Sequence, residues 1–181
     1  MGLRDRHFYH DKNIFFITTT AHEWLSLFTV GDPMQILSES LNFCATKYKA
    51  AILGYVFMPN HIHLIINFEE GIRRIDFMCD FKKFTSTKVR QEIERDRPSF
   101  LEKLLYIKDN QVFKVWKDRY DEVYLDKREL LEIKLEYIHT NPMQSHWNLA
   151  VSPEAYLYSS ASFYDKGVQN LVEVTHYLDV V

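Results

Sequence analysis

Two apolar segments joined by a short Met-Pro-Asn connection constrain the fold of this chain more than any other feature. The first runs from Ala50 to Phe57 and the second from His61 to Phe68. Short apolar runs rich in β-branched and aromatic residues, divided by a proline-containing turn, predict two antiparallel strands in a hairpin. Because successive side chains of a strand alternate between its faces, His61 and His63 share one face and Ile62 points to the other.

The remaining periodic segments complete a ferredoxin-like plan. We expect further strands at 14–20 and 112–116, with 122–125 continuing or following the latter, and helices at 32–48, 71–95 and 126–141. This order predicts an α+β fold with an RRM-like antiparallel sheet and two helices on one face. The additional helix at 126–141, with Asp126 and Glu129 at capping-box spacing, is expected to cover the other face. Leu131, Leu135 and Ile138 give it an apolar stripe for docking.

Tyr137 and Asn141 are the candidate chemical groups of this additional helix. They are four residues apart, so they lie on one helix face, and Pro142 ends the helix directly after them. Docking of the helix would bring both side chains over His61 and His63. Two imidazoles and a carboxamide oxygen can bind a divalent metal ion, and tyrosine is an established covalent nucleophile. The four residues therefore indicate a metal-dependent enzyme that acts on a phosphate ester.

Each of these residues also has an ordinary structural interpretation. An isolated His-x-His is more often a pair of polar residues on a solvated strand face. Tyr137 could pack the helix against the sheet, and Asn141 could cap the helix end. Tyr120 is the strongest rival nucleophile because it lies near a tryptophan and an arginine, and Tyr124 and Tyr158 are further rivals. We prefer Tyr137 because only this tyrosine has a carboxamide one turn later, before a helix-ending proline.

The chain resembles the HUH single-tyrosine transposases, which include the small insertion-sequence type and the REP-associated tyrosine transposases. The segments that carry the resemblance are 55–65, 80–85, 116–120, 134–142 and 158–161, in the order typical of the family. The combination of Met-Pro-Asn-His-x-His with Tyr-Ile-x-x-Asn-Pro is specific, whereas either motif alone is not. The resemblance spans roughly residues 14–161, so we expect one domain over 1–181 with a C-terminal tail at 162–181.

The resemblance implies an activity and a set of site residues. The family cleaves and rejoins single-stranded DNA near hairpins through a covalent 5′-phosphotyrosine bond. Tyr137 matches the nucleophile, and His61, His63 and Asn141 match the metal ligands. The implied cofactor is Mg²⁺ or Mn²⁺; imidazole ligands suit Mn²⁺ better, and both stay open. A homodimer with shared active sites and a monomer are both compatible with the resemblance.

Basic residues on and near the second helix are the candidates for DNA binding. These are Arg73, Arg74, Lys82, Lys83 and Arg119. Phosphate contacts need such side chains, although a solvated helix face is the commoner reason for a run of charges. The net charge of −3 and the sequence pI of about 6.2 exclude a broadly basic surface, so any DNA contact must be local.

Two departures from the family pattern concern the segment before the last strand. Residues 119–123 lack the histidine that many relatives carry a few residues after the tryptophan, and 98–110 looks like an insertion. An alternative function is therefore kept, a catalytically inactive ferredoxin-like module that binds single-stranded nucleic acid. The aromatic share of 15% and an open sheet face suit both functions.

The cellular setting is inferred from cysteine use and from the absence of targeting signals. Cys44 and Cys79 fall in expected helices and indicate buried or half-buried thiols of a reducing compartment. Met1 to Lys12 is charged and has no apolar core, so no signal peptide is expected. No apolar run approaches the length of a membrane span. We expect a cytoplasmic protein.

Overall fold

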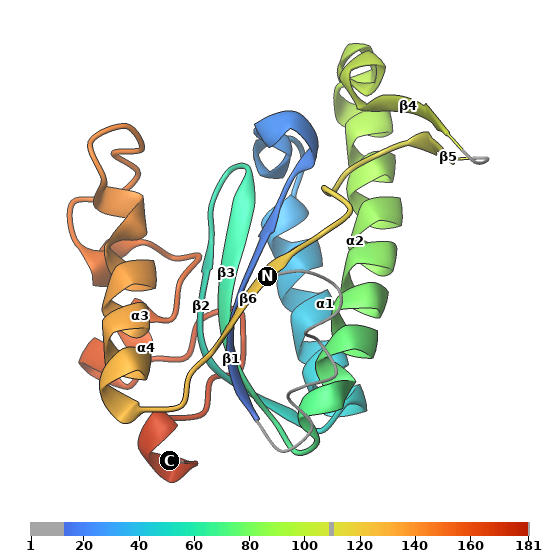
Figure 1. Cartoon of the computed structure of the whole chain (residues 1–181). Helices are drawn as coiled ribbons and strands as arrows, with labels where there is room; N and C mark the ends of the chain where they lie inside the picture. The colour runs from blue at the N-terminus through green and yellow to red at the C-terminus, as the bar shows by residue number, and fades with distance from the viewer. Residues whose placement is uncertain (1–12, 109–110, 181) are drawn as a thin grey trace.

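A four-stranded antiparallel sheet forms the centre of the molecule (Figure 1). It is seen in a computed structural model that describes residues 13–108 and 111–180; the charged segment 1–12 lies outside these ranges. The spatial order is β2-β3-β1-β6, with β1 at Ile14–Thr20, β2 at Ala50–Phe57, β3 at His61–Phe68 and β6 at Asp121–Tyr124. This order confirms the expected ferredoxin-like sheet and the hairpin of β2 and β3.

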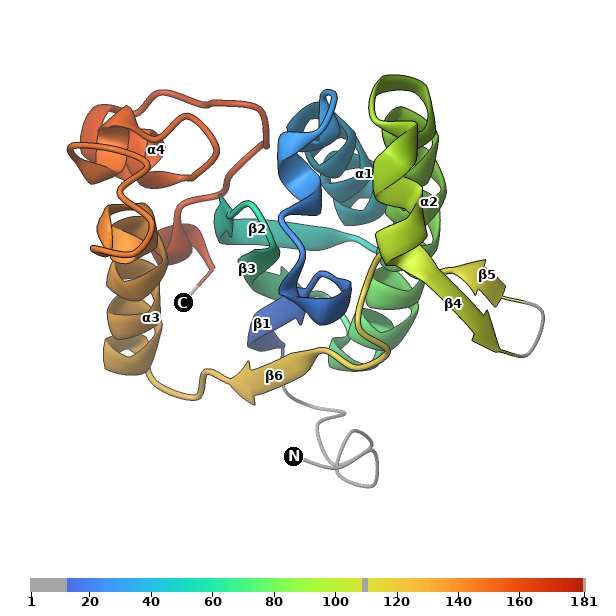
Figure 2. The ribbon, with the colours of Figure 1, turned by 90° about the horizontal axis from the view of Figure 1, so that it is seen from above.

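Helices cover both faces of the sheet (Figures 1 and 2). On one face lie α1 (Pro33–Lys47) and α2 (Arg74–Asp96), and on the other lie α3 (Arg128–Thr140) and α4 (Ala161–Lys166). Short 3₁₀ segments fill several connections: η2 (His22–Trp24), η3 (Leu27–Thr29), η4 (Gly71–Arg73), η5 (Pro98–Leu104), η6 (Asn141–Met143), η7 (Pro153–Ala155) and η8 (Tyr177–Asp179). None of the helices in the described ranges is long and apolar enough to cross a membrane.

Two apolar clusters result, one on each face of the sheet. Ile62, Leu64 and Ile66 belong to the larger cluster beneath α1 and α2. Ile65 belongs to the smaller cluster together with the predicted docking stripe of α3, which consists of Leu131, Leu135 and Ile138. The alternation predicted for β3 is therefore confirmed, and it allows one strand to contribute to both layers.

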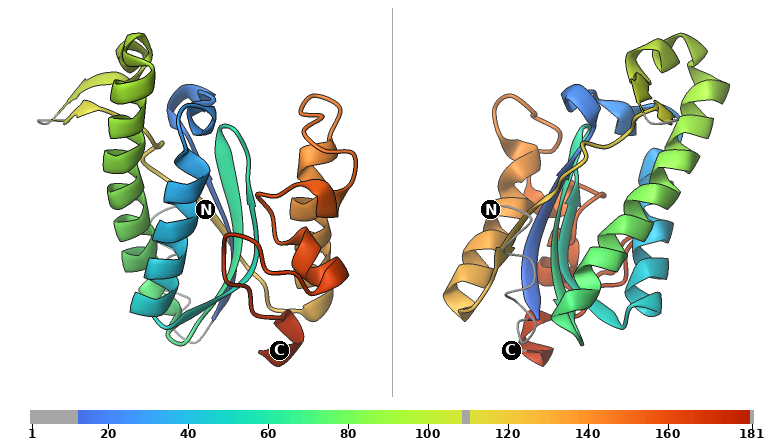
Figure 3. Two further views of the ribbon diagram at one scale, coloured as in Figure 1. Left: turned by 180° about the vertical axis from the view of Figure 1, so that it is seen from behind. Right: turned by 45° about the vertical axis from the view of Figure 1, so that its right-hand side comes forward.

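The prediction that residues 112–116 form a strand of the main sheet is wrong. Instead β4 (Leu105–Lys108) and β5 (Gln111–Phe113) form a separate two-stranded sheet beyond the end of α2 (Figure 3). After this hairpin Trp116 turns into the core, where it packs against Phe28 and Phe81 and donates a hydrogen bond from Nε1 to Thr85 Oγ1. The chain therefore reaches the sheet edge only at β6.

Helix ends agree with the sequence in one case and differ in another. Helix α1 begins at Pro33, as the Asp32-Pro33 pair predicts. Helix α3 begins at Arg128, and its N-cap makes no side-chain hydrogen bond, so the expected capping box opening at Asp126 does not form. The reason is that Leu125 still donates its N–H to the carbonyl of Ile14 (3.0 Å) at the sheet edge, which delays the helix.

The C-terminal segment lies along the outer edge of β2. Backbone hydrogen bonds join Phe57 to Tyr158 (2.9 Å) and Thr175 to Ile52 (2.9 Å). Val172 and Val174 are buried in the α1/α2 cluster. The part of the tail that the structure describes is therefore packed into the fold rather than appended to it.

The two cysteines are free thiols in different environments. Cys44 is buried, as expected, and its burial raises the pKa of the thiol to about 11. Cys79 is exposed on α2, which corrects the expectation of a buried or half-buried residue. Its position follows from the side of α2 that faces the sheet, which carries Phe77, Met78 and Phe81.

Candidate active site

The two histidines of β3 lie side by side under α3. Their ring centroids are 4.8 Å apart, and both side chains are buried. The His63 ring stacks on Phe16 (centroids 5.3 Å apart), a member of the α3-side cluster. The interpretation of His61 and His63 as solvated strand residues is therefore wrong.

Hydrogen bonds hold both imidazole rings by their Nδ1 atoms. Asn60 donates from Nδ2 to the carbonyl of Trp24 (3.1 Å), so its Oδ1 faces His61 and accepts a hydrogen bond from Nδ1 (2.7 Å). In His63, Nδ1 lies 2.8 Å from the hydroxyl of Thr18. Fixing one ring nitrogen through a neighbour is how proteins orient the other nitrogen toward a metal ion. The Nε2 atoms are thereby left for coordination.

Burial keeps both imidazoles uncharged at neutral pH. It lowers the pKa of His61 to about 4, with a further contribution from His146. It lowers the pKa of His63 to about 3, where the charges of His61 and Lys134 act in the same direction. Neutral imidazole is the form that binds a metal ion, so the pair is ready to coordinate without first losing protons.

A glycine in β2 allows α3 to approach the sheet closely. A Cβ atom built at Gly54 would lie 2.7 Å from Cδ1 of Leu135 and 3.0 Å from Cδ1 of Ile138, closer than ordinary packing permits. The helix therefore docks through its apolar stripe directly on the strand backbone. This close approach brings the adjacent face of α3 over the histidines.

Tyr137 extends from that face to the rim of the histidine pair. Its ring centroid lies 5.3 Å from that of His63 and 6.2 Å from that of Phe16, both in edge-on geometry. The side chain is still 41% exposed. Tyr137 is thus next to the His63 imidazole and accessible to a substrate.

Lys134 was not identified from the sequence, although it lies one turn before Tyr137. Its Nζ is 4.8 Å from the ring centroid of Phe16 and 5.7 Å from that of Tyr137. It forms no ion pair with a carboxylate in the described ranges. The i, i+3 spacing to Tyr137 was the available signal, since such residues share a helix face.

Asn141 supplies a buried oxygen that lacks a partner. Its side chain is 2% exposed, and Oδ1 accepts no hydrogen bond within residues 13–108 and 111–180. An unsatisfied buried carbonyl is costly, so it indicates a ligand. Asn141 is the C-cap residue of α3, as the capping alternative expects, although it keeps helical φ and ψ (−54° and −45°) and continues into η6 instead of adopting the αL conformation.

This donor set fits a divalent cation. The described residues include no cluster of three or more His, Cys, Asp or Glu side chains suited to a metal. The adjacent His61 and His63 imidazoles are candidate ligands for a metal ion, and the unpartnered Oδ1 of Asn141 is a candidate oxygen ligand at the end of α3. Two neutral nitrogens and one neutral oxygen leave positions for phosphate oxygens.

The rival tyrosines are placed elsewhere. Tyr120 is buried in the α1/α2 cluster, and Tyr124 packs against the same cluster, on the face opposite the histidines. Tyr158 packs against Tyr156 beside β2. Among the four candidates, Tyr137 is the one in ring contact with a histidine of β3.

The five predicted DNA-binding residues do not join this cluster. Arg74 is fully buried, and its guanidinium pairs with Glu122 (Nε to Oε2, 3.0 Å), so the prediction of a DNA contact is wrong for this residue. Lys82 donates from Nζ to the backbone carbonyls of residues 117 (2.6 Å) and 118 (3.1 Å). The other three, Arg73, Lys83 and Arg119, are exposed. Arg73 forms an ion pair with Glu70. The α2 residues lie on the layer opposite the histidines.

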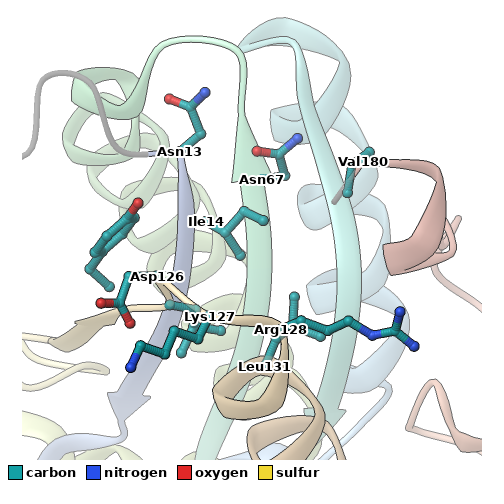
Figure 4. A pocket seen from close by; sticks show the side chains of 10 residues that line it. Asn13, Ile14, Asn67, Asp126, Lys127, Arg128, Leu131 and Val180 are labelled. Carbon is teal, nitrogen blue, oxygen red and sulfur yellow. The ribbon is translucent and has the colours of Figure 1, made fainter.

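A pocket of about 320 Å³ beside the start of α3 is a separate feature (Figure 4). Its lining includes Asn13, Asn67, Asp126 and Arg128. It lies at the opposite end of α3 from Asn141, and neither histidine of β3 lines it. We assign it no role in the chemistry.

Comparison with known proteins identifies the class and then the family. A ferredoxin-like sheet with a histidine pair beneath a tyrosine-bearing helix is the arrangement expected of a single-tyrosine transposase. The family model described as "Transposase IS200 like" matches residues 28–141, more than half of the chain. The chain belongs to the IS200-like transposases and is therefore a DNA-processing enzyme by family, as the sequence motifs predicted.

One solved structure supports the same fold. The chain is similar to the REP-associated tyrosine transposase bound to a REP hairpin, with a TM-score of 0.66 and 17% identity, covering 92% of this chain and 88% of the other. It is also similar to a Deinococcus radiodurans R1 protein classed provisionally as a transposase, with a TM-score of 0.46, 16% identity, and coverage of 71% and 90%. A search of curated proteins finds no match.

Proposed function

We propose that this chain cleaves and rejoins single-stranded DNA beside a hairpin, with a divalent metal ion as cofactor and Tyr137 as the nucleophile. The observation that carries the proposal is the edge-on contact of Tyr137 with His63, on a helix that also buries the unpartnered Oδ1 of Asn141. The structurally similar transposase bound to a REP hairpin supports hairpin DNA as the substrate class.

The metal site would be built from Nε2 of His61, Nε2 of His63 and Oδ1 of Asn141. Both Mg²⁺ and Mn²⁺ accept such ligands, and the two imidazoles favour Mn²⁺. When bound, the ion polarises an oxygen of the scissile phosphate and offsets the negative charge that builds up during attack. The hydrogen bonds of His61 with Oδ1 of Asn60 and of His63 with the hydroxyl of Thr18 hold the imidazole rings in place for this purpose.

Tyr137 performs the covalent step. Its phenolic oxygen attacks the phosphorus, so an O–P bond forms while the bond from phosphorus to the 3′-oxygen breaks. The phenolic proton passes to water, and the leaving 3′-oxygen takes up a proton to become a free hydroxyl. Attack by a 3′-hydroxyl on the 5′-phosphotyrosine reverses these steps and rejoins DNA, and no ATP is required because the phosphate ester is conserved.

Lys134 stabilises the charge that develops in this step. Its ammonium lies near the Tyr137 ring and has no competing carboxylate in the described part of the chain. A preorganised cation beside a reacting phosphate favours the transition state more than the ground state. Lys134 is therefore proposed as a contact to the scissile phosphate, in place of the remote basic residues on α2.

Labelled hairpin oligonucleotides taken from the DNA that flanks the gene test the proposal. With Mn²⁺ we expect a denaturation-resistant adduct that carries a 3′ label, while a 5′ label leaves on a fragment with a free 3′-hydroxyl. Tyr137→Phe and chelation by EDTA should each remove the adduct, whereas Tyr124→Phe, on the other sheet face, should keep it. Binding without an adduct under any metal would instead support the inactive single-strand-binding alternative.

A further inference from the structure

Two tryptophans flank His61, and the proposed chemistry uses neither. The ring centroid of Trp24 lies 6.0 Å from that of His61, and the ring centroid of Trp147 lies 5.9 Å from it. Trp24 is 55% exposed, and Trp147 is partly buried against the α3-side cluster. An exposed indole beside a reactive site presents a large apolar face that water solvates poorly, which indicates a ligand.

The backbone around Trp24 is held in an unfavourable conformation. Glu23 and Trp24 have φ of 51° and 57°, in the left-handed region that side chains other than glycine rarely adopt. Asn60 holds this turn by donating from Nδ2 to the carbonyl of Trp24 (3.1 Å), and the same amide accepts from His61. One side chain therefore fixes both an exposed indole and a candidate metal ligand.

A cation lies against the Trp24 ring. Lys117 places its Nζ 4.2 Å from the ring centroid, and its backbone N–H donates to the carbonyl of Thr20 (2.9 Å), the residue paired with His61 across the sheet. Lys117 forms no ion pair with any carboxylate that the structure describes. An ammonium beside an exposed aromatic ring is the combination that binds unpaired nucleotides, because the cation contacts phosphate and the ring stacks on the base.

Trp147 is positioned by the turn that follows α3. Its N–H donates to the carbonyl of Gln144 (2.8 Å), and Leu149 donates to the carbonyl of Pro142 (2.9 Å). Asn148 has a φ of 46°, so this turn too is in the left-handed region. The turn that carries Trp147 is thus joined to Pro142, which follows Asn141, and the turn that carries Trp24 is joined to Asn60, which precedes His61.

We propose that Trp24, Trp147 and Lys117 form a binding site for the single-stranded nucleotides that flank the scissile phosphate. Unpaired bases stack on the two indoles, and Lys117 contacts a backbone phosphate. The site extends the proposed function, on which it depends for the position of the scissile phosphate. It holds the strand across His61 with little preference for sequence, because every base has a face that stacks.

Intrinsic tryptophan fluorescence tests the site without a metal ion. The chain has three tryptophans, and Trp116 is buried with its Nε1 hydrogen-bonded, so quenching by DNA reports Trp24 and Trp147. The full chain in EDTA is titrated with short oligothymidylate. We expect quenching, and we expect Trp24→Ala and Trp147→Ala each to weaken binding about 5-fold or more, the loss of one stacked base. Trp24→Phe should retain most of the affinity.

Salt dependence tests the lysine separately. Lys117→Gln should reduce the slope of log affinity against log salt by about 0.7, the value for one phosphate contact to a single strand. Matched controls on the far layer are Phe43→Ala, which removes another exposed aromatic ring, and Lys88→Gln, which removes another lysine near an aromatic ring. Both should leave affinity and slope unchanged.

The outcomes separate the site from the proposed function. Unchanged affinity in both tryptophan variants, or an equal loss in Phe43→Ala, overturns the nucleotide site even if Tyr137 still forms its adduct. Quenching that is lost in Trp24→Ala supports the nucleotide site even if the wild-type chain forms no adduct with DNA. In that case only the proposed cleavage activity is contradicted.

Discussion

The two faces of the sheet differ in what they bury, although β3 contributes to both. Beneath α1 and α2 the strand presents Ile62 and Leu64 to a large apolar cluster. Beneath α3 it presents Ile65 to a smaller apolar cluster, and beside that cluster it presents His61 and His63, with the His63 ring in contact with Tyr137. The first face buries apolar side chains from β3, whereas the second combines a smaller apolar cluster with polar side chains that a ligand can contact. Substitutions at neighbouring positions of one strand should therefore affect different properties.

The largest expected effect separates activity from stability. His63→Ala should reduce single-turnover cleavage about 1000-fold or more, because it removes a proposed metal ligand. Leu64→Ala should instead lower the free energy of unfolding by about 2 to 5 kcal/mol, because it opens a cavity in the larger cluster. Urea denaturation and cleavage of a labelled hairpin measure both variants. If His63→Ala destabilised the chain as much as Leu64→Ala, the two faces would not be divided in this way.

A buried ion pair makes the α1/α2 face intolerant of a single charge change. Arg74→Ala should lower the free energy of unfolding by about 3 to 5 kcal/mol, because Glu122 would stay buried without its partner. The double variant Arg74→Met with Glu122→Leu should recover much of this loss in thermal or urea unfolding. Affinity of the folded double variant for oligothymidylate should equal that of wild type. A selective loss of DNA binding would restore Arg74 as a DNA contact.

The close approach of α3 to β2 gives an intermediate effect on the other face. Gly54→Ala should displace α3 through contacts with Leu135 and Ile138, lowering the free energy of unfolding by about 1 to 3 kcal/mol. Cleavage should fall further than stability alone explains, because Tyr137 moves relative to His63. Adding Leu135→Val, which shortens the opposing side chain, should restore part of the cleavage rate. No change in rate for Gly54→Ala would show that this packing does not position the nucleophile.

The smallest expected stability change belongs to Asn141. Asn141→Ala removes a buried oxygen without a partner, so the free energy of unfolding without metal should be unchanged or higher by up to about 1 kcal/mol. Binding of Mn²⁺, measured by titration calorimetry, should weaken about 10-fold or more. Thr140→Ala, at the half-buried preceding residue on the helix, is the matched control. Unweakened Mn²⁺ binding would remove Asn141 from the ligand set.

Local periodicity explains how much of this could be predicted from the sequence. The alternation of β3 and the apolar stripe of α3 follow from residues close together in the sequence, so the sequence alone predicts that Tyr137 lies over the His61 and His63 pair, and the ring contact of Tyr137 with His63 agrees with this prediction. The role of Asn141 as a metal ligand stays a prediction. The fourth strand of the sheet, β6, is defined by its pairing with β1, which lies far away along the chain. This pairing leaves no local pattern of apolar residues in the sequence.

Residues whose roles depend on distant partners could not be predicted. The sequence shows Arg74 only as one of several cations in a helical segment. Its burial depends on an ion pair with Glu122, which lies 48 residues later in the chain. In the sequence Trp24 cannot be distinguished from other aromatic residues. Its exposure depends on a left-handed turn that the side chain of the distant Asn60 holds in place. Lys134 was recognisable only by its spacing to Tyr137.

The hydrogen bonds of the C-terminal segment to β2 have a kinetic consequence. The same segment attaches α3 to the body of its own chain, since the Tyr177 hydroxyl donates to Glu132 (2.7 Å). Tyr137 and His63 therefore belong to the same chain at the site, so the effective concentration of the tyrosine there does not change when the protein is diluted. Under the proposed function, the cleavage rate per molecule should stay constant as the protein is diluted, and the DNA end joined to Tyr137 should stay on the same chain as His61 and His63. An exchange of helices between copies would need the C-terminal segment to detach first.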